Sequence, residues 1–316
     1  MTVGLRRPDA DDRVVGELLA RCTFPPSGTA VSCAVSGGAD SSALLALAVV
    51  AGLDVTAVHV DHGLRPGSAA EAEVVRELAQ AWGASFVARS CVVEPGGDVE
   101  ARARAARHRL VGPGALFGHT ADDQAETVVL RLLRGTGPTG LAAMRATTHP
   151  ILGLRRAETE ALGEHLGVDV VRDPTNTDLR FRRNRVRAEV MPLLDGVAER
   201  DVVPLLCRLA EQSAQVADLL EVLAAELDPT SARALSTAPA PVAAAAFRRW
   251  WSEVTGEPFP PDAASIDRVM AVARGEATRC DVARGWSLRR SAGRLHLEST
   301  SAPSSTDDDA RSMGLG

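Results

Sequence analysis

The sequence predicts an α/β fold, in which helices cover both faces of a parallel sheet, followed by a smaller, mainly helical domain. Short apolar runs alternate with stretches of helical length from Thr29 to Gly135, an alternation typical of parallel sheets. From about Asp201 the composition changes to long segments rich in Ala and Leu. The residues after 298 are mostly Ser, Thr, Asp and Gly, which are too polar for a packed core. We therefore expect a larger domain over 1–200, a helical domain over 201–298 and a disordered tail over 299–316.

The elements of the larger domain follow one another in a regular order. Apolar runs predict four buried strands, over 30–35, 55–60, 85–92 and 115–118. Apolar residues at helical spacing predict helices after each of them, over 40–51, 68–82, 99–110 and 122–133. The domain then ends with a short strand near 149–152, a helix near 158–166 and a polar turn at 173–176. In the second domain we expect helices over 203–227 and 241–254 and a short terminal pattern over 286–297.

Composition excludes several classes of protein. The chain carries 35 Lys and Arg against 41 Asp and Glu, a net charge of −6, and every basic residue is an arginine. Without lysine it can neither contain a phosphate loop that ends in Gly-Lys-Ser/Thr nor form a Schiff base. The 5 cysteines include no Cys-x-x-Cys pair, which favours reduced thiols. The longest apolar run, 43–53, is too short to cross a bilayer, and the N-terminus lacks the plan of a signal peptide. We therefore expect a cytoplasmic protein without a membrane partner.

The strongest signal is a glycine turn between the first predicted strand and its helix. The turn and the first helical residues comprise Ser36, Gly37, Gly38, Asp40, Ser41 and Ser42. Glycines allow the backbone to turn tightly, and the first amides of a helix point outward with the positive end of its dipole behind them. A simple helix cap is the alternative interpretation. Because ligands of open parallel sheets bind where such turns follow the strands, we predict that this turn binds phosphate.

A second polar cluster ends the second predicted strand, with His59, Asp61, His62 and Arg65. Two histidines and an aspartate are potential metal ligands. On a strand, however, His59 and Asp61 share one face while His62 begins the loop. No Cys or carboxylate at metal-ligand spacing accompanies them. We therefore favour a loop that contacts a nucleotide over a structural metal site.

A third cluster follows the fourth predicted strand and opens the next helix. It contains His119, Asp122, Asp123 and Glu126, with Asp122 and Glu126 four residues apart on one helix face. Carboxylates that merely complement the helix dipole are the alternative. Since the geometry of a parallel sheet brings this loop and the glycine turn together at one edge, we favour a site for Mg²⁺ and a cationic substrate.

Two stretches of the chain are rich in arginine. The predicted helix over 99–110 carries several, of which any one could neutralise charge on a transferring phosphoryl group, and spacing does not choose between them. Five more lie within 180–187, a run that contains no acidic residue. A solvated helix face is the usual interpretation of such a run. Because no acid lies inside it, we expect its positive charge to be locally uncompensated.

Together these motifs resemble the N-type ATP pyrophosphatase family, and within it the branch that modifies isoleucine tRNA. The resemblance rests on 36–41, 59–65, 100–108 and 118–127, is extended by 131–137, 140–144, 173–176 and 183–187, and covers about 29–195. It implies an adenine nucleotide alpha hydrolase-like fold, with ATP and Mg²⁺ as cofactors. It also implies that the enzyme adenylates the wobble cytidine of isoleucine tRNA with a CAU anticodon and releases pyrophosphate. The ε-amine of free L-lysine then displaces AMP and leaves lysidine.

The resemblance also implies roles for individual residues. The ATP-binding set would be Ser36, Gly37, Gly38, Asp40, Ser41, Ser42 and His59. Asp40 and Asp123 would hold the metal, Glu126 would face the lysine, and His119 and the catalytic cation Arg107 would complete the site. The tRNA-binding set would be Asp61, His62, Arg65, Arg182, Arg183, Arg185 and Arg187. The oligomeric state is left open, a homodimer included.

Three alternatives remain at this point. A tRNA thiolase of the same superfamily also adenylates a base carbonyl, but it typically needs paired cysteines, and Cys33, Cys91, Cys207 and Cys280 include no close pair. A metal-dependent phosphoesterase would use His59, Asp61, His62, His119, Asp122 and Asp123. A regulatory module would bind ATP without releasing pyrophosphate.

Overall fold

The computed structural model describes residues 4–61, 68–90, 110–112, 114–171, 178–257 and 259–300. The chain divides into two compact units, Met1–Ala214 and Gln215–Gly316. The division falls inside a long helix, α10 (Val203–Ala225). The boundary predicted at residue 200 precedes this helix in the sequence.

The first unit is built on a sheet whose four described strands all run parallel. Its strands are β1 (Ala30–Ala34), β2 (Asp54–Asp61), β3 (Ser85–Ser90) and β4 (Leu116–Phe117). Their order across the sheet is β3-β2-β1-β4. The chain therefore adds β2 and β3 on one side of β1 and then returns to add β4 on the other side, which makes the gap between β1 and β4 a topological switch point. In open α/β sheets, ligands bind outside the carboxyl ends of the strands at this kind of switch point. The predicted parallel sheet is confirmed.

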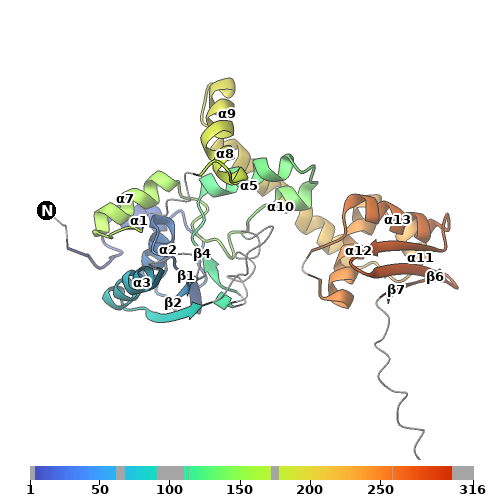
Figure 1. Cartoon of the computed structure of the whole chain (residues 1–316), viewed down its shortest axis with the longest axis horizontal. Helices are drawn as coiled ribbons and strands as arrows, with labels where there is room; N and C mark the ends of the chain where they lie inside the picture. Colours follow the sequence, from blue (N-terminus) through green and yellow to red (C-terminus); the bar gives the residue numbers. More distant parts are fainter. Residues whose placement is uncertain are drawn as a thin grey trace, which may run out of the picture. The chain divides into compact units, whose positions relative to one another are not determined.

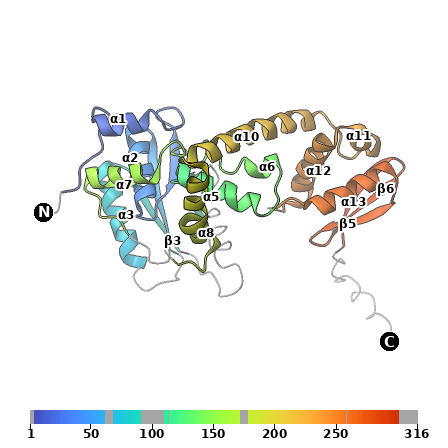
Figure 2. The same ribbon diagram turned by 90° about the horizontal axis from the view of Figure 1, so that it is seen from above.

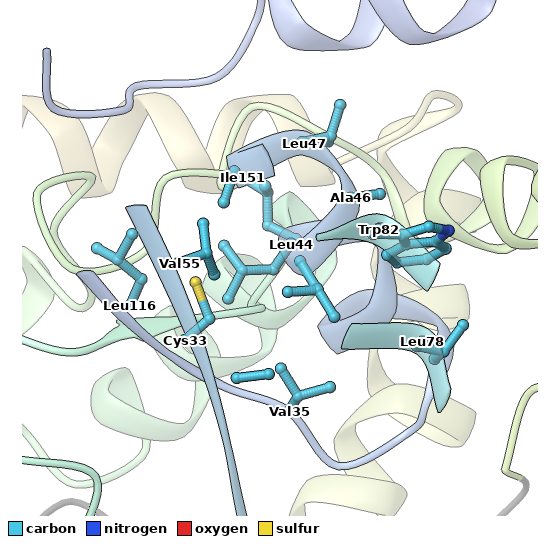
Figure 3. Packing of buried hydrophobic residues seen from close by; sticks show 14 of the residues in the cluster. Cys33, Val35, Leu44, Ala46, Leu47, Val55, Leu78, Trp82, Leu116 and Ile151 are labelled. Atoms are coloured by element: carbon cyan, nitrogen blue, oxygen red, sulfur yellow. The ribbon is translucent and has the colours of Figure 1, made fainter. Parts of the chain in front are cut away.

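Two helices pack side by side against one face of this sheet, α2 (Ala39–Val50) and α3 (Ser68–Trp82). The middle of α2 is buried on all sides because α1 (Arg13–Leu19) and α7 (Arg156–Leu166) also contact it. Its sequence is accordingly apolar all round. Figure 3 shows Leu44 and Leu47 of α2 among Cys33, Val55 and Leu116 from three strands. The result is a largely aliphatic core that includes most of α2, the helix that follows the glycine turn. Figure 1 shows α1 and α7 next to this helix.

The opposite face of the sheet carries a smaller apolar cluster. Successive residues of β2 point to opposite faces, so Ala57 joins the main core while Val58 contacts Phe117 and Val111. The helix predicted over 99–110 lies, except for Leu110, outside the described residues. So does the predicted polar turn at 173–176.

The structure differs from the prediction after β4. The strand predicted near 149–152 is wrong, because this segment is a series of turns in which His149 N donates to Arg145 O (3.0 Å) and Leu152 N to His149 O (3.2 Å). The segment is apolar because Ile151 and Leu154 are fully buried in the main core. Burial of a turn and burial of a strand leave the same short apolar run in a sequence.

The segments that follow the sheet carry the rest of the site. They are α5 (Ala121–Leu132), α6 (Pro138–Leu141), α8 (Arg182–Arg185), a π-helical turn η2 (Val186–Val190) and α9 (Met191–Ala198). Ala125 and Val129 of α5 form a separate apolar cluster with Val186 and Met191. This packing places the arginine run of 180–187 against α5, and α5 and α8 are neighbours in Figure 2.

The second unit combines helices with an antiparallel sheet. Its elements after α10 are α11 (Ala232–Thr237), α12 (Ala240–Thr255), α13 (Ala263–Arg274), β5 (Arg279–Ala283), β6 (Trp286–Ser291) and β7 (Arg294–Ser299). The strands pair in the order β5-β6-β7, and Phe247 and Trp251 of α12 are buried with them in one core. The predicted helices are confirmed, whereas the short terminal pattern is a three-stranded sheet that begins at Arg279. Of the predicted tail, Ser299 still belongs to β7, and 301–316 lie outside the described residues.

In the part of the chain that the structure describes, none of the helices combines the length and the apolar character that crossing a membrane requires.

Candidate active site

The glycine turn lies between the end of β1 and the start of α2, as predicted. Gly37 has a φ of +84°, which favours glycine. Ser36 N donates to Ser41 Oγ (3.2 Å), and Ser41 Oγ donates to Gly38 O (3.0 Å), so the first turn of α2 closes the loop on itself. Gly38 is the N-cap and has no side chain to cover the first helix amides. Those amides have no partner inside the helix and carry the positive end of its dipole, as a phosphate site requires.

His59 supports this turn from the neighbouring strand. Its Nδ1 lies 3.0 Å from Val35 O, the carbonyl that immediately precedes Ser36. The contact makes Nδ1 the protonated nitrogen, because a carbonyl only accepts. The ring is buried, and within the described residues neither its Nε2 nor the hydroxyl of Ser42 has a hydrogen-bond partner. These are the two orphaned buried polar atoms next to the turn that a bound nucleotide would satisfy.

Gly118 brings the end of β4 against the start of α2. A Cβ at this position would lie 2.6 Å from Asp40 O and 2.9 Å from Ser41 Cα, so no other residue fits without movement of the backbone. His119, the next residue, contacts the ring of His149 at 4.9 Å between centroids. The two loops that the sequence places at the switch point therefore meet at one edge of the sheet, as predicted.

Asp123 and Glu126 form an acidic pair on the first turns of α5. Asp123 Oδ2 accepts from Thr120 N (2.9 Å) and Thr120 Oγ1 (3.1 Å), which caps the helix. Asp123 Oδ1 accepts from Arg156 Nη2 (3.0 Å) and Arg183 Nη2 (2.9 Å). The cap therefore fixes one oxygen of Asp123, while the other faces the site.

Glu126 is the most deeply buried acid of the site, with a side chain only 2% exposed. Its Oε2 accepts from Arg183 Nε (2.9 Å), and its Oε1 accepts from Arg187 Nε (2.7 Å). Arg156 Nη2 lies 3.3 Å from Oε1. Three guanidinium groups thus surround two carboxylates, and the local charge is positive by one. We call these five side chains the arginine–carboxylate cluster: Asp123, Glu126, Arg156, Arg183 and Arg187.

The electrostatic environments of the site's two aspartates differ. Burial raises the pKa of Asp123, but Arg183, Arg156 and His119 outweigh burial and lower it to about 2. Burial raises the pKa of Asp40 to about 6, against the hydroxyl of Thr159, which donates to its Oδ1. The charge of Asp123 also raises the pKa of Asp40, and Arg156 contacts both carboxylates, with Nε 3.9 Å from Asp40 Oδ2 and Nη2 3.0 Å from Asp123 Oδ1.

Asp122 has a different side-chain partner from Asp123 and Glu126. Its Oδ2 accepts from Arg155 Nε (3.1 Å) and its Oδ1 accepts from Arg155 Nη2 (3.0 Å). Asp122 Oδ2 also accepts from Arg156 N (2.8 Å). The pair that faces the site is Asp123 with Glu126, which is three residues further on.

The arginine run is largely compensated, contrary to the sequence expectation. Arg183 and Arg187 belong to the arginine–carboxylate cluster, while Arg185 pairs with Glu189 (2.9 Å) and Arg180 with Asp178 (2.7 Å). Within the described residues, Arg182 has no ion pair. The compensating acids are Asp123 and Glu126 from α5 and two acids just outside the run, which an inspection of 180–187 alone cannot find.

Comparison with known proteins agrees with this geometry. Residues 12–194 match the family model of the PP-loop domain, and residues 231–296 match that of the TilS substrate binding domain. The chain is 40% identical over 273 residues to the tRNA(Ile)-lysidine synthase of Nocardia farcinica, covering 80% of this chain and 85% of the relative. It is 41% identical over 264 residues to the enzyme of that name from Mycolicibacterium paratuberculosis, covering 77% and 81%.

The chain belongs to the tRNA(Ile)-lysidine synthase family. The family inferred from the motifs is thereby confirmed, and with it the PP-loop domain and the separate C-terminal module of this synthase family.

The fold is shared more widely than the synthase family. The solved structure of the U34-tRNA thiolase NcsA from Methanococcus maripaludis, with its [4Fe-4S] cluster, matches with a TM-score of 0.53 and 14% identity, over 65% of this chain and 81% of that chain. This likeness concerns the fold alone. The four described cysteines are free thiols, and burial raises the pKa of Cys22 and of Cys33 to about 12 and that of Cys207 to about 11. Nothing among them favours sulfur chemistry.

The residues present fit ATP and Mg²⁺. The open helix start at Gly38 and the orphaned Ser42 hydroxyl provide donors for phosphate oxygens. The described residues contain no group of three or more His, Cys, Asp and Glu that could hold a metal ion. Mg²⁺, however, usually takes only one or two carboxylates and fills its shell with phosphates and water. Asp40 and Asp123 are a suitable carboxylate pair.

Sequence reasoning missed two residues of the candidate site. Arg156 links Asp40 (3.9 Å), Asp123 and Glu126, and Thr159 holds Asp40 from the same helix, α7. One signal was available: Arg155 and Arg156 stand at the start of a helix, where the dipole disfavours cations unless carboxylates compensate them. His62, Arg65 and Arg107 lie outside the described residues, and Asp61 is the last residue of β2.

Proposed function

We propose that the protein attaches free L-lysine to the wobble cytidine of isoleucine tRNA with a CAU anticodon, and that it consumes ATP through an adenylated cytidine. The observation that carries the proposal is the contact at Gly118, where the residues that lead into α5 lie against the start of α2, next to the glycine turn. A triphosphate on the turn is thereby next to carboxylates suited to a cation. Membership of the synthase family supports the choice of substrates.

In the first step the cytidine carbonyl oxygen attacks the α-phosphorus of ATP, and the P–O bond to pyrophosphate breaks. The turn at Ser36–Gly38 and the first amides of α2 hold the leaving phosphates. Asp40 and Asp123 would hold Mg²⁺, which would neutralise phosphate charge when bound. His59 keeps the turn in place through Val35. Arg107 is the proposed cation at the transferring group.

In the second step the ε-ammonium group of lysine first loses a proton to the solvent. The free amine then attacks the activated carbon of the base, the bond from that carbon to the adenylated oxygen breaks, and AMP leaves with this oxygen. Glu126 is buried at the centre of the arginine–carboxylate cluster, so an ammonium group that reaches it gains a charge-assisted hydrogen bond in a poorly solvated place. Arg183 and Arg187 occupy that carboxylate in the described conformation. Lysine therefore replaces one of these guanidinium groups, which turns outward.

The test is transfer of radiolabelled lysine to a transcript of isoleucine tRNA with a CAU anticodon, with pyrophosphate measured in the same reaction. We expect label in the tRNA and pyrophosphate in equal amounts, both dependent on ATP. A transcript with uridine in place of the wobble cytidine is the matched control and should accept no lysine. Pyrophosphate release that ignores tRNA, or labelling of the control transcript, would overturn the proposal.

A further inference from the structure

Phe181 stands out among the aromatic residues of the first unit. Phe181 is 38% exposed, whereas Phe24 and Phe86 are half-buried and Phe117 is buried. It is the N-cap of α8, and its neighbour Leu179 is 49% exposed. An exposed ring gains nothing from the core of its own chain. The question is therefore what could cover it.

The turn that carries Phe181 is rigidly braced. Phe181 N donates to Asp178 O (3.2 Å), and Asn184 Nδ2 donates to the same carbonyl (2.9 Å). The guanidinium of Arg180 forks onto the carboxylate of Asp178, with Nη2 2.7 Å from Oδ2. On the other side, Arg185 N donates to Phe181 O (3.1 Å). A ring on so constrained a backbone loses little entropy when a partner binds, which is what a binding platform requires.

The charge around the ring limits the kind of partner. Of the five arginines in the run, four are held by carboxylates, and the one without an ion pair among the described residues is Arg182, the immediate neighbour of Phe181. A flat apolar surface next to a single available cation matches a nucleotide, which offers a base to stack and a phosphate to neutralise. A peptide partner would need a larger apolar surface than one ring and Leu179.

The place of Phe181 in the chain limits which nucleotide it would meet. Arg183, two residues beyond Phe181, contacts both Asp123 and Glu126. Phe181 is not itself a member of the arginine–carboxylate cluster, but only one residue separates it from Arg183 along the backbone. The proposed function brings the reacting base to the cluster, so a base stacked on Phe181 would be one that lies near the reacting base in the RNA.

We propose that Phe181 is a stacking platform for an unpaired anticodon-loop base that flanks the reacting cytidine, and that Arg182 contacts the adjoining phosphate. The inference rests on the proposed function for the identity of the RNA. It adds a residue that positions the tRNA to the residues that act on it.

The experiment uses the full chain and an RNA hairpin that carries the anticodon arm of isoleucine tRNA with its CAU anticodon. Two versions hold 2-aminopurine, one on each side of the wobble cytidine, because its fluorescence falls when it stacks on an aromatic ring. The variants are Phe181→Ala, Phe181→Leu, which keeps apolar bulk without a π face, and Phe181→Trp, which keeps the π face. Leu179→Ala is the matched control, since it removes an exposed apolar side chain from the same turn. Thermal unfolding of each variant checks that it folds.

We expect the wild type to quench one of the two hairpins and to bind it about 5- to 150-fold more tightly than Phe181→Ala does, the range that stacking of one base supports. Phe181→Leu should resemble the Ala variant, Phe181→Trp should restore both quenching and affinity, and Leu179→Ala should match the wild type. Equal binding and quenching by all variants would overturn the proposed stacking platform. Lysine transfer by the wild type would still support the proposed function in that case. A wild type that neither binds the hairpin nor transfers lysine would overturn both.

Discussion

The glycine turn and the arginine–carboxylate cluster lie at the same edge of the sheet but are assembled in different ways. Residues within a few positions of one another build the turn: Gly37 supplies the φ, Gly38 the open helix start and Ser41 the closing hydrogen bonds. The cluster joins α5 to α7, α8 and η2, and the partners of its hydrogen bonds are 30 to 61 positions apart in the sequence.

This difference suggests a division of labour. A backbone turn holds its amide groups in one fixed arrangement, so its hydrogen-bond donors are already in position before a phosphate binds. An ion-pair cluster with three cations for two anions has a surplus cation and can exchange partners, because an incoming ammonium or phosphate group replaces one of its members. We therefore expect substitutions in the turn to abolish the reaction and substitutions in the cluster to change how individual substrates bind.

The largest effect should come from Gly118→Ala. The new Cβ would lie 2.6 Å from Asp40 O, so either the start of α2 or the residues after β4 must shift. Either shift would displace the glycine turn relative to the acidic pair. We expect pyrophosphate release to fall by more than about 100-fold, since misplacement by about 1 Å has such effects on catalysis. The matched control is Gly196→Ala within α9, where nothing lies within 4 Å. It should keep full activity and stabilise the protein by about 0.5–1 kcal/mol. Normal turnover by Gly118→Ala would mean that the contact does not set the site's geometry.

The next effect concerns the cluster. Glu126→Gln keeps the shape of the side chain but removes the charge that an ammonium would meet. We expect the KM for lysine to rise at least about 10-fold, the equivalent of about 1.4 kcal/mol, while the KM for ATP changes less than about twofold. Asp123→Asn should instead weaken the Mg²⁺-dependent release of pyrophosphate. Steady-state kinetics with each substrate varied in turn separates the two. Equal effects of both variants on both substrates would contradict the separate roles.

A smaller effect is expected beside the cluster, at Asp122. Burial raises its pKa, but the hydrogen bonds from Arg155 and from the backbone of Arg156 outweigh burial and hold the pKa below its ordinary value. A carboxylate with a lowered folded-state pKa stabilises the fold above its unfolded pKa, about 3.9, and loses that contribution as the pH falls through the folded value. Asp122→Asn should therefore lower the Tm at pH 7 and flatten the decline of Tm below about pH 4. Parallel acid limbs for the two proteins would show that the Arg155 pair contributes nothing to stability.

The same comparison explains what the sequence could predict. The parallel strands, the glycine turn and the meeting of the two loops follow from local patterns and from the rule for switch points, and the structure confirms them. The cluster depends on tertiary partners. Helical spacing allows Glu126 to share a face with either Asp122 or Asp123, and only the positions of Arg155 and Arg156 decide between them. The C-terminal sheet was missed for a related reason: β5 is short and largely polar, with Val282 as its only fully buried apolar residue.

The smallest effect distinguishes two arginines that look alike in the sequence. Arg182 has no ion pair among the described residues, whereas Arg185 is held by Glu189, four residues further on. Each phosphate neutralised by a free cation contributes about 0.7 to 0.9 to the slope of log K against log salt concentration. Arg182→Ala should therefore reduce the slope for tRNA binding by nearly that amount and weaken binding a few-fold at moderate salt. Arg185→Ala removes a cation that is already compensated, so its slope should stay close to that of the wild type. Affinities at several salt concentrations measure both. If Arg185→Ala lowers the slope as much as Arg182→Ala does, tRNA breaks the exposed pair with Glu189, and the whole run, not Arg182 alone, serves as the phosphate surface.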